Sequence, residues 1–322
     1  MEKIDGIGVV IIGRNEGERL KKCIKSLSFY DIPVVYVDSN SSDGSVEYAK
    51  SIGINVVSLD PKSKINASVA RNAGFNWLMQ QENKIEYIHF IDADCEMNKD
   101  WLKNAVNALS NDNLLAAVNG RLREKNINLS IFTRILDMSW YSFPGELNYC
   151  GGIATVRSKV YDELNGFDES LIAGADPEFY TRVKNAGYKM RNIGTDMGTH
   201  DSAMTSWKQY YTRTVKTGFG FAHSTKLSIW KHRKKSILLW ALIIPAFIII
   251  SISTYPILVI LLLIYPIQML RISLKLNIPY SFPNKLLYGI FCVLDKFPQL
   301  IGVIKFHYRQ YSQSQNKIIE YK

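Results

Sequence analysis

The chain lacks the short motifs that mark several common catalytic and nucleotide-binding sites. No Gly-x-Gly-x-x-Gly follows the first apolar segment and no Gly-x-x-x-x-Gly-Lys-Ser/Thr occurs, so a Rossmann dinucleotide site and a P-loop lack support. His-Glu-x-x-His and Gly-x-Ser-x-Gly are absent as well. The four cysteines are scattered without a Cys-x-x-Cys pair. This excludes a zinc ribbon and a dense disulfide framework, and it fits a reducing compartment.

Acidic residues are scarce in the last third of the chain. The net charge is +10, yet residues 1–224 carry a net charge of −1. Residues 225–322 carry +11, because Asp295 and Glu320 are their only acids. Positive charge that flanks a long apolar run is a membrane signature before it is a nucleic-acid signature. We therefore expect membrane lipids as a partner and no nucleic acid.

A segment without any charged residue runs from Ile237 to Leu270, over 34 residues. One membrane-spanning helix needs about 20 apolar residues, so this length is too long for one upright span and slightly short for two. Ser251–Pro256 is its most polar stretch, which predicts a turn there and a tight transmembrane hairpin. One strongly tilted span and a buried helix pair of a soluble protein are the alternatives.

Basic clusters stand at both ends of the uncharged segment and indicate its orientation. They comprise Lys231, Arg233, Lys234 and Lys235 before it, and Arg271 and Lys275 after it. Positive charge marks the cytoplasmic side, so both ends are expected there. Residues 281–305 mix apolar and charged side chains, which favours an amphipathic helix at the membrane interface over a third span. No signal peptide is recognisable at the N-terminus, so the first 225 residues are expected in the cytoplasm, at the inner membrane.

The first two-thirds alternate between short apolar runs and segments with helical spacing. Strands are expected over residues 8–12, 34–37, 54–59 and 87–91, and helices over 20–27, 46–52 and 68–81. This alternation predicts an α/β domain with a mostly parallel, doubly wound sheet. Ligands of such sheets bind at the carboxyl ends of the strands. Arg14, Asp38 and Asp92 all follow the predicted strands at that edge.

Asp92-Ala93-Asp94 is the sharpest chemical signal in the sequence. Two carboxylates one residue apart at a strand end can face one cleft and share a divalent cation. Such hard oxygen ligands suit Mg²⁺ or Mn²⁺, which usually complete their coordination with substrate phosphates. A solvated turn is the plain alternative for an Asp-x-Asp in isolation.

Several segments together resemble the inverting family 2 glycosyltransferases with the GT-A fold. They are VVIIGRNEGERLKKCIKSL, VVYVDSNSSDGS, ASVARNAGFNWL, YIHFIDADCEM, YCGGIATVRSKVYDELNGFDESLIAGADPEFYTRVKNAGYKM and, less specifically, GTHDSAM. The resemblance covers residues 7–220, and its strength lies in the order and spacing of these segments. It implies a membrane-anchored enzyme that uses a nucleotide-sugar donor and Mn²⁺ or Mg²⁺.

The resemblance also implies roles for individual residues. Asp38 matches the acid that binds the nucleotide base, commonly uracil, and Arg71 the arginine near the diphosphate. Asp176 matches the catalytic base. The loop residues expected to line the base are Gly13, Arg14 and Glu16. The residues expected at the metal are Asp92, which also belongs to the donor site, Asp94 and His200.

Two departures from the family pattern bear on the chemistry. The usual Glu-Asp pair is Ala175-Asp176 here, and Glu178 is a rival for the base. The Gln-x-x-Arg-Trp of processive synthases is replaced by Gln209-Tyr-Tyr-Thr-Arg213, which favours transfer of a single sugar.

Structural roles are the plain alternatives at the same positions. Asp38 and Asp176 could cap a turn and a helix, respectively. Arg71 could form a surface ion pair, and His200 could be an ordinary loop histidine. Gly151-Gly152 predicts either a close backbone approach to the acceptor or a simple turn.

We thus expect four parts: a nucleotide-sugar half (1–120), an acceptor and catalytic half (121–225), a transmembrane hairpin (226–275) and an interfacial tail (276–322). The predicted function is transfer of one sugar, with UDP-sugars as the preferred donors, to a lipid-linked acceptor in cell-surface polysaccharide or glycolipid synthesis. A polyprenyl-phosphate sugar transferase is a close variant. A nucleotidyltransferase and an inactive subunit of a synthase complex are the competing hypotheses.

Overall fold

The computed structural model describes residues 2–81, 84–223 and 228–312. The chain divides into two units, which are described separately below. Unit 1 comprises Met1–Lys125 and Trp140–Ser202, and unit 2 comprises Asn126–Ser139 and Ala203–Lys322. Residues 126–139 thus group with the C-terminal helices, although the sequence assigned them to the acceptor half.

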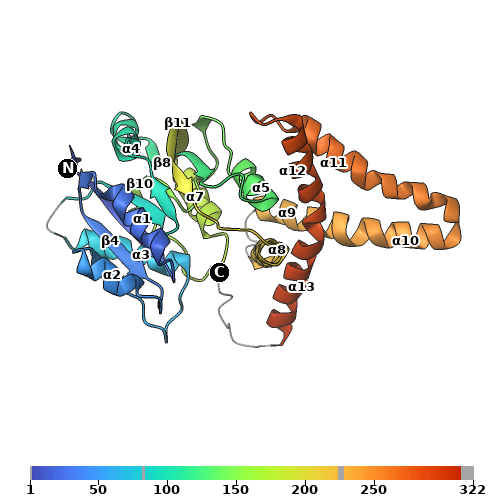
Figure 1. The fold of residues 1–322 in the computed structure, drawn as a ribbon, viewed down its shortest axis with the longest axis horizontal. Helices are drawn as coiled ribbons and strands as arrows, with labels where there is room; N and C mark the ends of the chain where they lie inside the picture. The colour runs from blue at the N-terminus through green and yellow to red at the C-terminus, as the bar shows by residue number, and fades with distance from the viewer. Residues whose placement is uncertain (1, 82–83, 224–227, 313–322) are drawn as a thin grey trace. The chain divides into compact units, whose positions relative to one another are not determined.

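Unit 1 is built around a curled nine-stranded sheet (Figure 1). Its main path has the order β5-β4-β2-β6-β10-β8-β11-β7, and β9 pairs with β11. Strands β5, β4, β2 and β6 are parallel, whereas β10 runs antiparallel to both β6 and β8. The α/β fold is as predicted, with antiparallel strands added after residue 92. The strands are β1 (Glu2–Lys3), β2 (Ile7–Gly13), β3 (Tyr30–Asp31), β4 (Val34–Asp38), β5 (Asn55–Ser58), β6 (Tyr87–Asp92), β7 (Cys95–Met97), β8 (Leu115–Glu124), β9 (Gly145–Glu146), β10 (Ala154–Arg157) and β11 (Lys189–His200).

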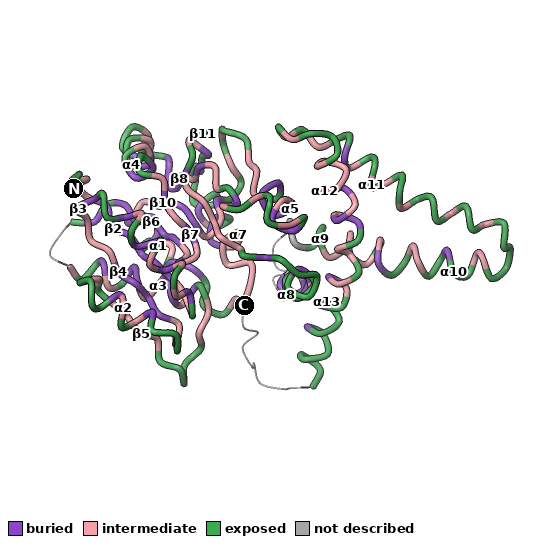
Figure 2. The backbone as a smooth tube through the Cα atoms, in the orientation of Figure 1, coloured by how far each residue is buried: buried purple, intermediate pink, exposed green. Residues whose placement is uncertain are grey.

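Helices cover both faces of this sheet, and the central strands are buried between them (Figure 2). Strand β2 explains the two-sided core, because successive side chains point to opposite faces. Val9 and Ile11 join one hydrophobic cluster and Val10 joins the other. The helices of unit 1 are α1 (Glu18–Leu27), α2 (Ser45–Ser51), α3 (Ala67–Met79), α4 (Trp101–Ser110), α6 (Ser158–Glu163) and α7 (Ala175–Asn185).

Helix α3 lies unusually close to the sheet. Its N-terminus is capped by the Asn66 side chain, which accepts a hydrogen bond of 2.9 Å from the Val69 amide. One glycine in the helix permits the close approach: a Cβ added at Gly74 would lie 2.3 Å from a methyl carbon of Val10. This contact brings Arg71, one turn earlier on α3, to the carboxyl ends of the strands.

The secondary structure assigned to the described residues of unit 2 is all helical, with short turns between the helices. Its helices are α5 (Ile131–Ser139), α8 (Trp207–His223), α9 (Ser228–Leu238), a π-helical turn (Leu239–Ile243), α10 (Ile244–Thr254), a 3₁₀ segment (Pro256–Leu263), α11 (Ile264–Lys275), α12 (Phe282–Leu294) and α13 (Lys296–Tyr311). The chain reverses at Tyr255, inside the predicted turn, and α10 and α11 form a hairpin (Figure 1). The Tyr265 hydroxyl donates a 3.0 Å hydrogen bond to the Trp240 carbonyl across this hairpin.

Within the described part of the chain, three helical stretches are long and apolar enough to cross a membrane. They are Lys231–Thr254, Pro256–Lys275 and Phe282–Tyr311. At 1.5 Å per residue, the 24 and 20 residues of the first two reach the roughly 30 Å of a bilayer core. The hairpin is therefore long enough for two complete crossings, because helical residues beyond the uncharged segment add to each arm.

Helices α8 and α13 pack backbone to backbone through two glycines. A Cβ at Gly218 would lie 2.0 Å from the Gln299 carbonyl oxygen, and one at Gly302 would lie 2.1 Å from the Val215 carbonyl oxygen. The absence of a side chain at these two positions lets the helix backbones approach closely. The same device joins α11 and α12, where a Cβ at Gly289 would lie 2.5 Å from the Met269 carbonyl oxygen.

Candidate active site

The ends of three parallel strands form one row at the carboxyl edge of the sheet in unit 1. Gly13 of β2 is paired with Asp38 of β4, and Ile12 is paired with Asp92 of β6. Gly13 must be small, because a Cβ there would lie 2.6 Å from the Ala93 methyl group. The predicted convergence of the loop after β2, Asp38 and Asp92 at this edge is therefore observed.

The carboxylate of Asp38 is buried and held by two hydrogen bonds. The Tyr36 hydroxyl donates to Oδ1 at 2.8 Å, and the Ser41 amide donates to Oδ2 at 2.9 Å. Burial raises the pKa of Tyr36, so its hydroxyl keeps its proton and remains a donor. Asp38 is the last residue of β4 and accepts a hydrogen bond from the following turn, so a capping contact coexists with any contact to a nucleotide base.

The predicted loop residues Arg14 and Glu16 follow β2 directly. Glu16 is buried, and its Oε2 forms a 2.6 Å ion pair with Nη2 of Arg19. Arg19 also donates from Nη1 to the Asp201 carbonyl oxygen at 3.2 Å. The loop is thereby fastened to the segment that follows β11.

Arg71 joins two of the predicted acids. Its Nη2 donates to Oδ1 of Asp92 at 3.0 Å, and its Nη1 lies 3.6 Å from Oδ1 of Asp176. Burial alone would lower the pKa of the Arg71 guanidinium. The negative charges of Asp92 and Asp176 have the larger effect, so this pKa is raised. Burial raises the pKa of Asp92, and so does the neighbouring carboxylate of Asp94. Arg71 opposes both effects, but the pKa of Asp92 stays above its ordinary value. Arg71 is thus a buried, shared cation and not a surface ion pair.

Gly152 is the residue that leaves room for this arginine. A Cβ at Gly152 would lie 2.2 Å from Nη2 of Arg71, whereas a Cβ at Gly151 would meet nothing within 4 Å. The close approach seen here is made by Gly152 toward Arg71, and the approach of Gly151-Gly152 to an acceptor stays a prediction.

The two candidate bases, Asp176 and Glu178, have different surroundings. Both oxygens of Glu178 accept hydrogen bonds of 2.7 Å from Arg182, which also donates to the Gly166 carbonyl oxygen at 2.8 Å. Glu178 therefore stabilises the turn at Gly166. The suggestion that Asp176 caps its helix is wrong: Gly174, in the left-handed region at φ 82°, occupies the N-cap, and Asp176 lies within the first turn of α7.

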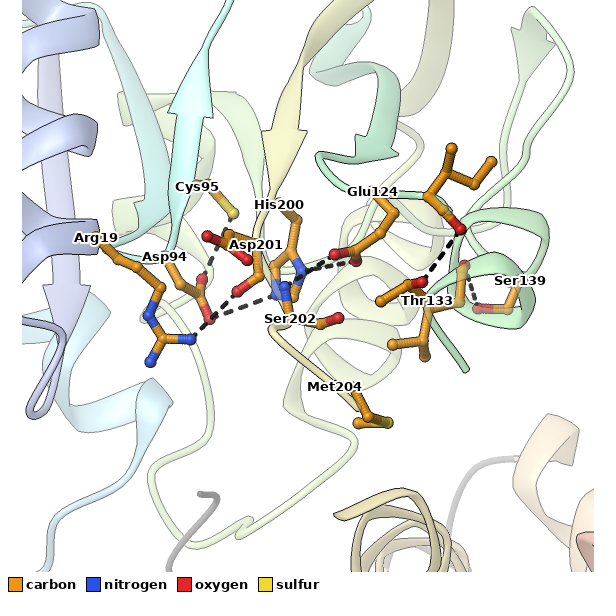
Figure 3. Close-up of polar contacts among 12 residues, drawn as sticks. Arg19, Asp94, Cys95, Glu124, Thr133, Ser139, His200, Asp201, Ser202 and Met204 are labelled. Carbon is orange, nitrogen blue, oxygen red and sulfur yellow. Dashed lines mark hydrogen bonds and ion pairs between the residues drawn. The ribbon is translucent and has the colours of Figure 1, made fainter. Parts of the chain in front are cut away.

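A second group of polar residues surrounds His200 at the end of β11 (Figure 3). Strand β11 pairs with β8 and β7 so that His200 stands opposite Glu124 on one side and Cys95 on the other. Nε2 of His200 lies 3.4 Å from Oδ2 of Asp94, and Nδ1 lies 3.5 Å from Oε2 of Glu124. Burial alone would lower the pKa of His200, but the two carboxylates raise it to about 9.

Potential metal-ligand atoms come together in this second group. Among the residues that the structure describes, one atom from each of Asp94, Cys95 and His200 lies within 4.8 Å of the others. Burial raises the pKa of Cys95 well above its ordinary value, and its thiol donates a 3.6 Å hydrogen bond to Oδ1 of Asp94. A soft sulfur is also a poor match for Mg²⁺ or Mn²⁺, which prefer oxygen. A carboxylate and an imidazole remain. The carboxylate suits either Mn²⁺ or Mg²⁺, whereas the imidazole favours the transition ion Mn²⁺ over the oxygen-preferring Mg²⁺. Asp92, the other predicted ligand, directs its Oδ1 toward Arg71 instead.

Sequence reasoning missed Glu124, Arg19 and Trp140. Glu124 closes the group around His200, Arg19 ties the loop after β2, and the Trp140 ring packs edge-on against His200 with centroids 4.6 Å apart. Each contact joins segments far apart in the chain, so no local motif could have revealed it.

Comparisons with known proteins agree with this geometry. The profile of the family "Glycosyl transferase family 2" matches residues 8–163. The glycosyltransferase AglE of Haloferax volcanii is 24% identical over 60% of this chain and 66% of its own length. The O-antigen chain rhamnosyltransferase RfbN of Salmonella typhimurium is 27% identical over 61% of this chain and 65% of its own. The matched region thus spans just under two thirds of either relative.

A solved structure extends the likeness beyond the family profile. The mannosyltransferase PcManGT of Pyrobaculum calidifontis, determined in complex with GDP-Man and Mn²⁺, superposes with a TM-score of 0.61 at 16% identity. The superposition covers 95% of this chain and 88% of that one. At this identity the likeness establishes the fold.

Proposed function

Because residues 8–163 form a domain of glycosyl transferase family 2, we propose that the protein transfers one sugar from a nucleoside-diphosphate sugar to a lipid-linked acceptor. The proposed transfer inverts the configuration at the anomeric carbon. The observation that carries the proposal is the meeting of Arg71 with Asp92 and Asp176, next to Asp94 and His200. These residues come from four separate segments and converge at the edge where α/β sheets bind ligands.

Asp176 is the proposed base. An acceptor hydroxyl must lose a proton as it attacks the anomeric carbon, and a positioned carboxylate accepts that proton. A single displacement from the side opposite the leaving group inverts the configuration, so no second carboxylate nucleophile is required. Glu178 is unsuited to this role because Arg182 occupies both of its oxygens.

The proposed metal site consists of Asp94 and His200, with Asp92 beside them. When bound, a divalent cation neutralises the negative charge that develops on the leaving diphosphate. Arg71 fixes the orientation of the Asp92 and Asp176 carboxylates around the reacting groups. PcManGT was solved with Mn²⁺ and GDP-Man, which supports a metal and adds GDP-sugars to the UDP-sugars expected as donors.

We further propose that the α10–α11 hairpin enters the cytoplasmic membrane and that α12 and α13 lie along its surface. Figure 1 shows α12 and α13 running across the base of the hairpin. Helix α13 packs tightly along α8, and α8 carries Lys208, Arg213 and Lys216, which are costly inside a bilayer. An acceptor with a lipid tail would then meet a catalytic domain tethered at the same surface, on the cytoplasmic face.

The test follows nucleoside-diphosphate release by the detergent-purified full-length protein. UDP-, GDP- and dTDP-sugars are supplied with Mn²⁺, with Mg²⁺ or with a chelator, and candidate lipid acceptors are added afterwards. The variants are Asp94→Ala, Asp176→Asn and, as a control remote from the site, Asp112→Asn. We expect one donor to release its diphosphate only with metal, and both site variants to lose this activity. Release that survives both the chelator and the two site variants would refute the assignment.

A further inference from the structure

Glu124 is a fully buried carboxylate beside the proposed metal site. It ends β8, its side chain has 0% exposure, and the parallel register of β8 and β11 sets it directly opposite His200. Its Oε1 accepts a 3.1 Å hydrogen bond from the Ser202 amide, and its Oε2 lies 3.5 Å from Nδ1 of His200 (Figure 3). A buried carboxylate is costly unless it is paired, and the imidazole of His200 is one of the groups next to it.

The backbone around His200 is held by hydrogen bonds between strands, and its imidazole packs against an aromatic ring. The Lys125 amide donates to the His200 carbonyl at 2.9 Å, and the Asp201 amide donates to the Asp94 carbonyl at 2.9 Å. The Trp140 ring packs edge-on against the imidazole. Nε2 then points toward Asp94 Oδ2, 3.4 Å away.

The two nitrogens of a histidine have different roles when one of them binds a metal. The nitrogen that keeps its proton donates it to a partner, and this contact fixes the tautomer, orients the ring and strengthens the other nitrogen as a ligand. A buried carboxylate next to Nδ1, with Nε2 facing a second carboxylate, is the arrangement that such pairing requires.

We propose that Glu124 is a positioning residue that holds the proton of His200 on Nδ1 and so presents Nε2, together with Asp94, to the divalent cation. The inference rests on the proposed function, because it presupposes a metal ion at Asp94 and His200. Metal affinity would then depend on Glu124, a residue outside the Asp-x-Asp segment.

The experiment measures binding of Mn²⁺ alone to the full-length protein, without any nucleotide. Electron paramagnetic resonance of free Mn²⁺ gives the Kd, and electron spin-echo modulation from a directly bound histidine nitrogen reports coordination by His200. Glu124→Gln keeps the size and the acceptor for Ser202 but removes the charge. Removing such a partner typically weakens metal binding about 10–100-fold, and we expect a loss in this range.

Asp112→Asn is the matched control. Asp112 precedes β8 at the end opposite to Glu124, and its Oδ2 pairs with Nη2 of Arg191 on β11 at 3.2 Å. Asp112→Asn therefore removes a carboxylate that pairs with β11, as Glu124 does, but far from His200. We expect its Mn²⁺ Kd to stay within twofold of that of the unmodified protein. Glu124→Asp retains the buried charge but withdraws it by one methylene, and provides a second variant if Glu124→Gln does not fold.

The outcomes separate the inference from the proposed function. An unchanged Mn²⁺ Kd in both Glu124 variants overturns the positioning role, even if Asp94→Ala and His200→Ala abolish binding. Mn²⁺ binding that depends on Asp94 but lacks nitrogen modulation overturns it as well and leaves the proposed carboxylate ligand standing. An unmodified protein that binds no Mn²⁺ refutes the proposed metal site, and the inference with it. A raised Kd in the Glu124 variants, with the control unchanged, supports the inference.

Discussion

Replacement of Gly152 by alanine should impair catalysis while leaving the fold largely intact. The added Cβ would lie 2.2 Å from Nη2 of Arg71. Non-bonded heavy atoms settle at about 3.5 Å, so the guanidinium must retreat by more than about 1 Å. Its 3.0 Å hydrogen bond to Asp92 would then exceed hydrogen-bonding range. The obstacle is the far end of a flexible side chain, so the backbone can stay in place.

The expected effect is a fall in kcat of about 100-fold, because a displacement of about 1 Å among reacting groups can cost that much. The assay is the rate of nucleoside-diphosphate release at saturating donor and metal, accompanied by the thermal unfolding temperature in detergent. Gly151→Ala is the matched control, since a Cβ there meets nothing within 4 Å and neither glycine has a positive φ.

A double-mutant cycle tests the reasoning directly. In an Arg71→Lys background the branched guanidinium is gone, so adding Gly152→Ala should cost much less than it does alone. Equal activities of Gly151→Ala and Gly152→Ala would refute the argument. Strict additivity of Gly152→Ala and Arg71→Lys would show that Gly152 acts through something other than Arg71.

Two further predictions concern stability. His89 is buried in β6, with Nδ1 3.0 Å from the Thr155 hydroxyl, and burial lowers its pKa to about 3. Between these pH values the unfolded chain binds a proton at His89 that the folded chain does not bind. His89 should therefore reduce the unfolding free energy by up to about 1.4 kcal/mol per pH unit as the pH falls from about 6.5 toward 3. His89→Gln should flatten that dependence in denaturant titrations between pH 7 and 4, and an unchanged slope would contradict the assignment. Gly302→Ala would set a Cβ 2.1 Å from the Val215 carbonyl oxygen and force α8 and α13 apart. This overpacking should cost about 1–3 kcal/mol of unfolding free energy and lower the unfolding temperature, whereas Ile301→Ala, on the exposed side of α13, should leave that temperature unchanged. Equal unfolding temperatures for the two variants would argue against backbone packing.

The sequence was sufficient for the elements that form the ligand-binding edge. Apolar runs predicted β2, β4 and β6 to within about two residues, because strands buried on both faces carry a strong local signal. The edge strand β5 was predicted equally well, although it is only partly buried. Parallel strands bring their carboxyl ends together, so the alignment of Asp38 and Asp92 followed from chain direction alone.

The second half of the sheet was not predictable in the same way. Strand β10 runs antiparallel between β6 and β8, and β7 and β9 contain only three and two residues. The contact of Glu124 with His200 depends on the pairing of β8 with β11, across 76 positions of sequence. Local periodicity carries no information about such a register. The contact of Arg71 with Gly152 likewise exists only after α3 has packed against the sheet.

The charges around the site bear on the proposed requirement for a metal ion. Asp92, Asp94, Glu124 and Asp176 surround two cationic side chains, Arg71 and His200. Arg71 is shared between two of these acids and His200 between the other two, so little positive potential remains for a diphosphate. A nucleoside diphosphate is itself an anion and would be repelled by this edge of the sheet. A divalent cation held by Asp94 and His200, as proposed, would offset most of this negative charge and would present a positive ion directly to the diphosphate.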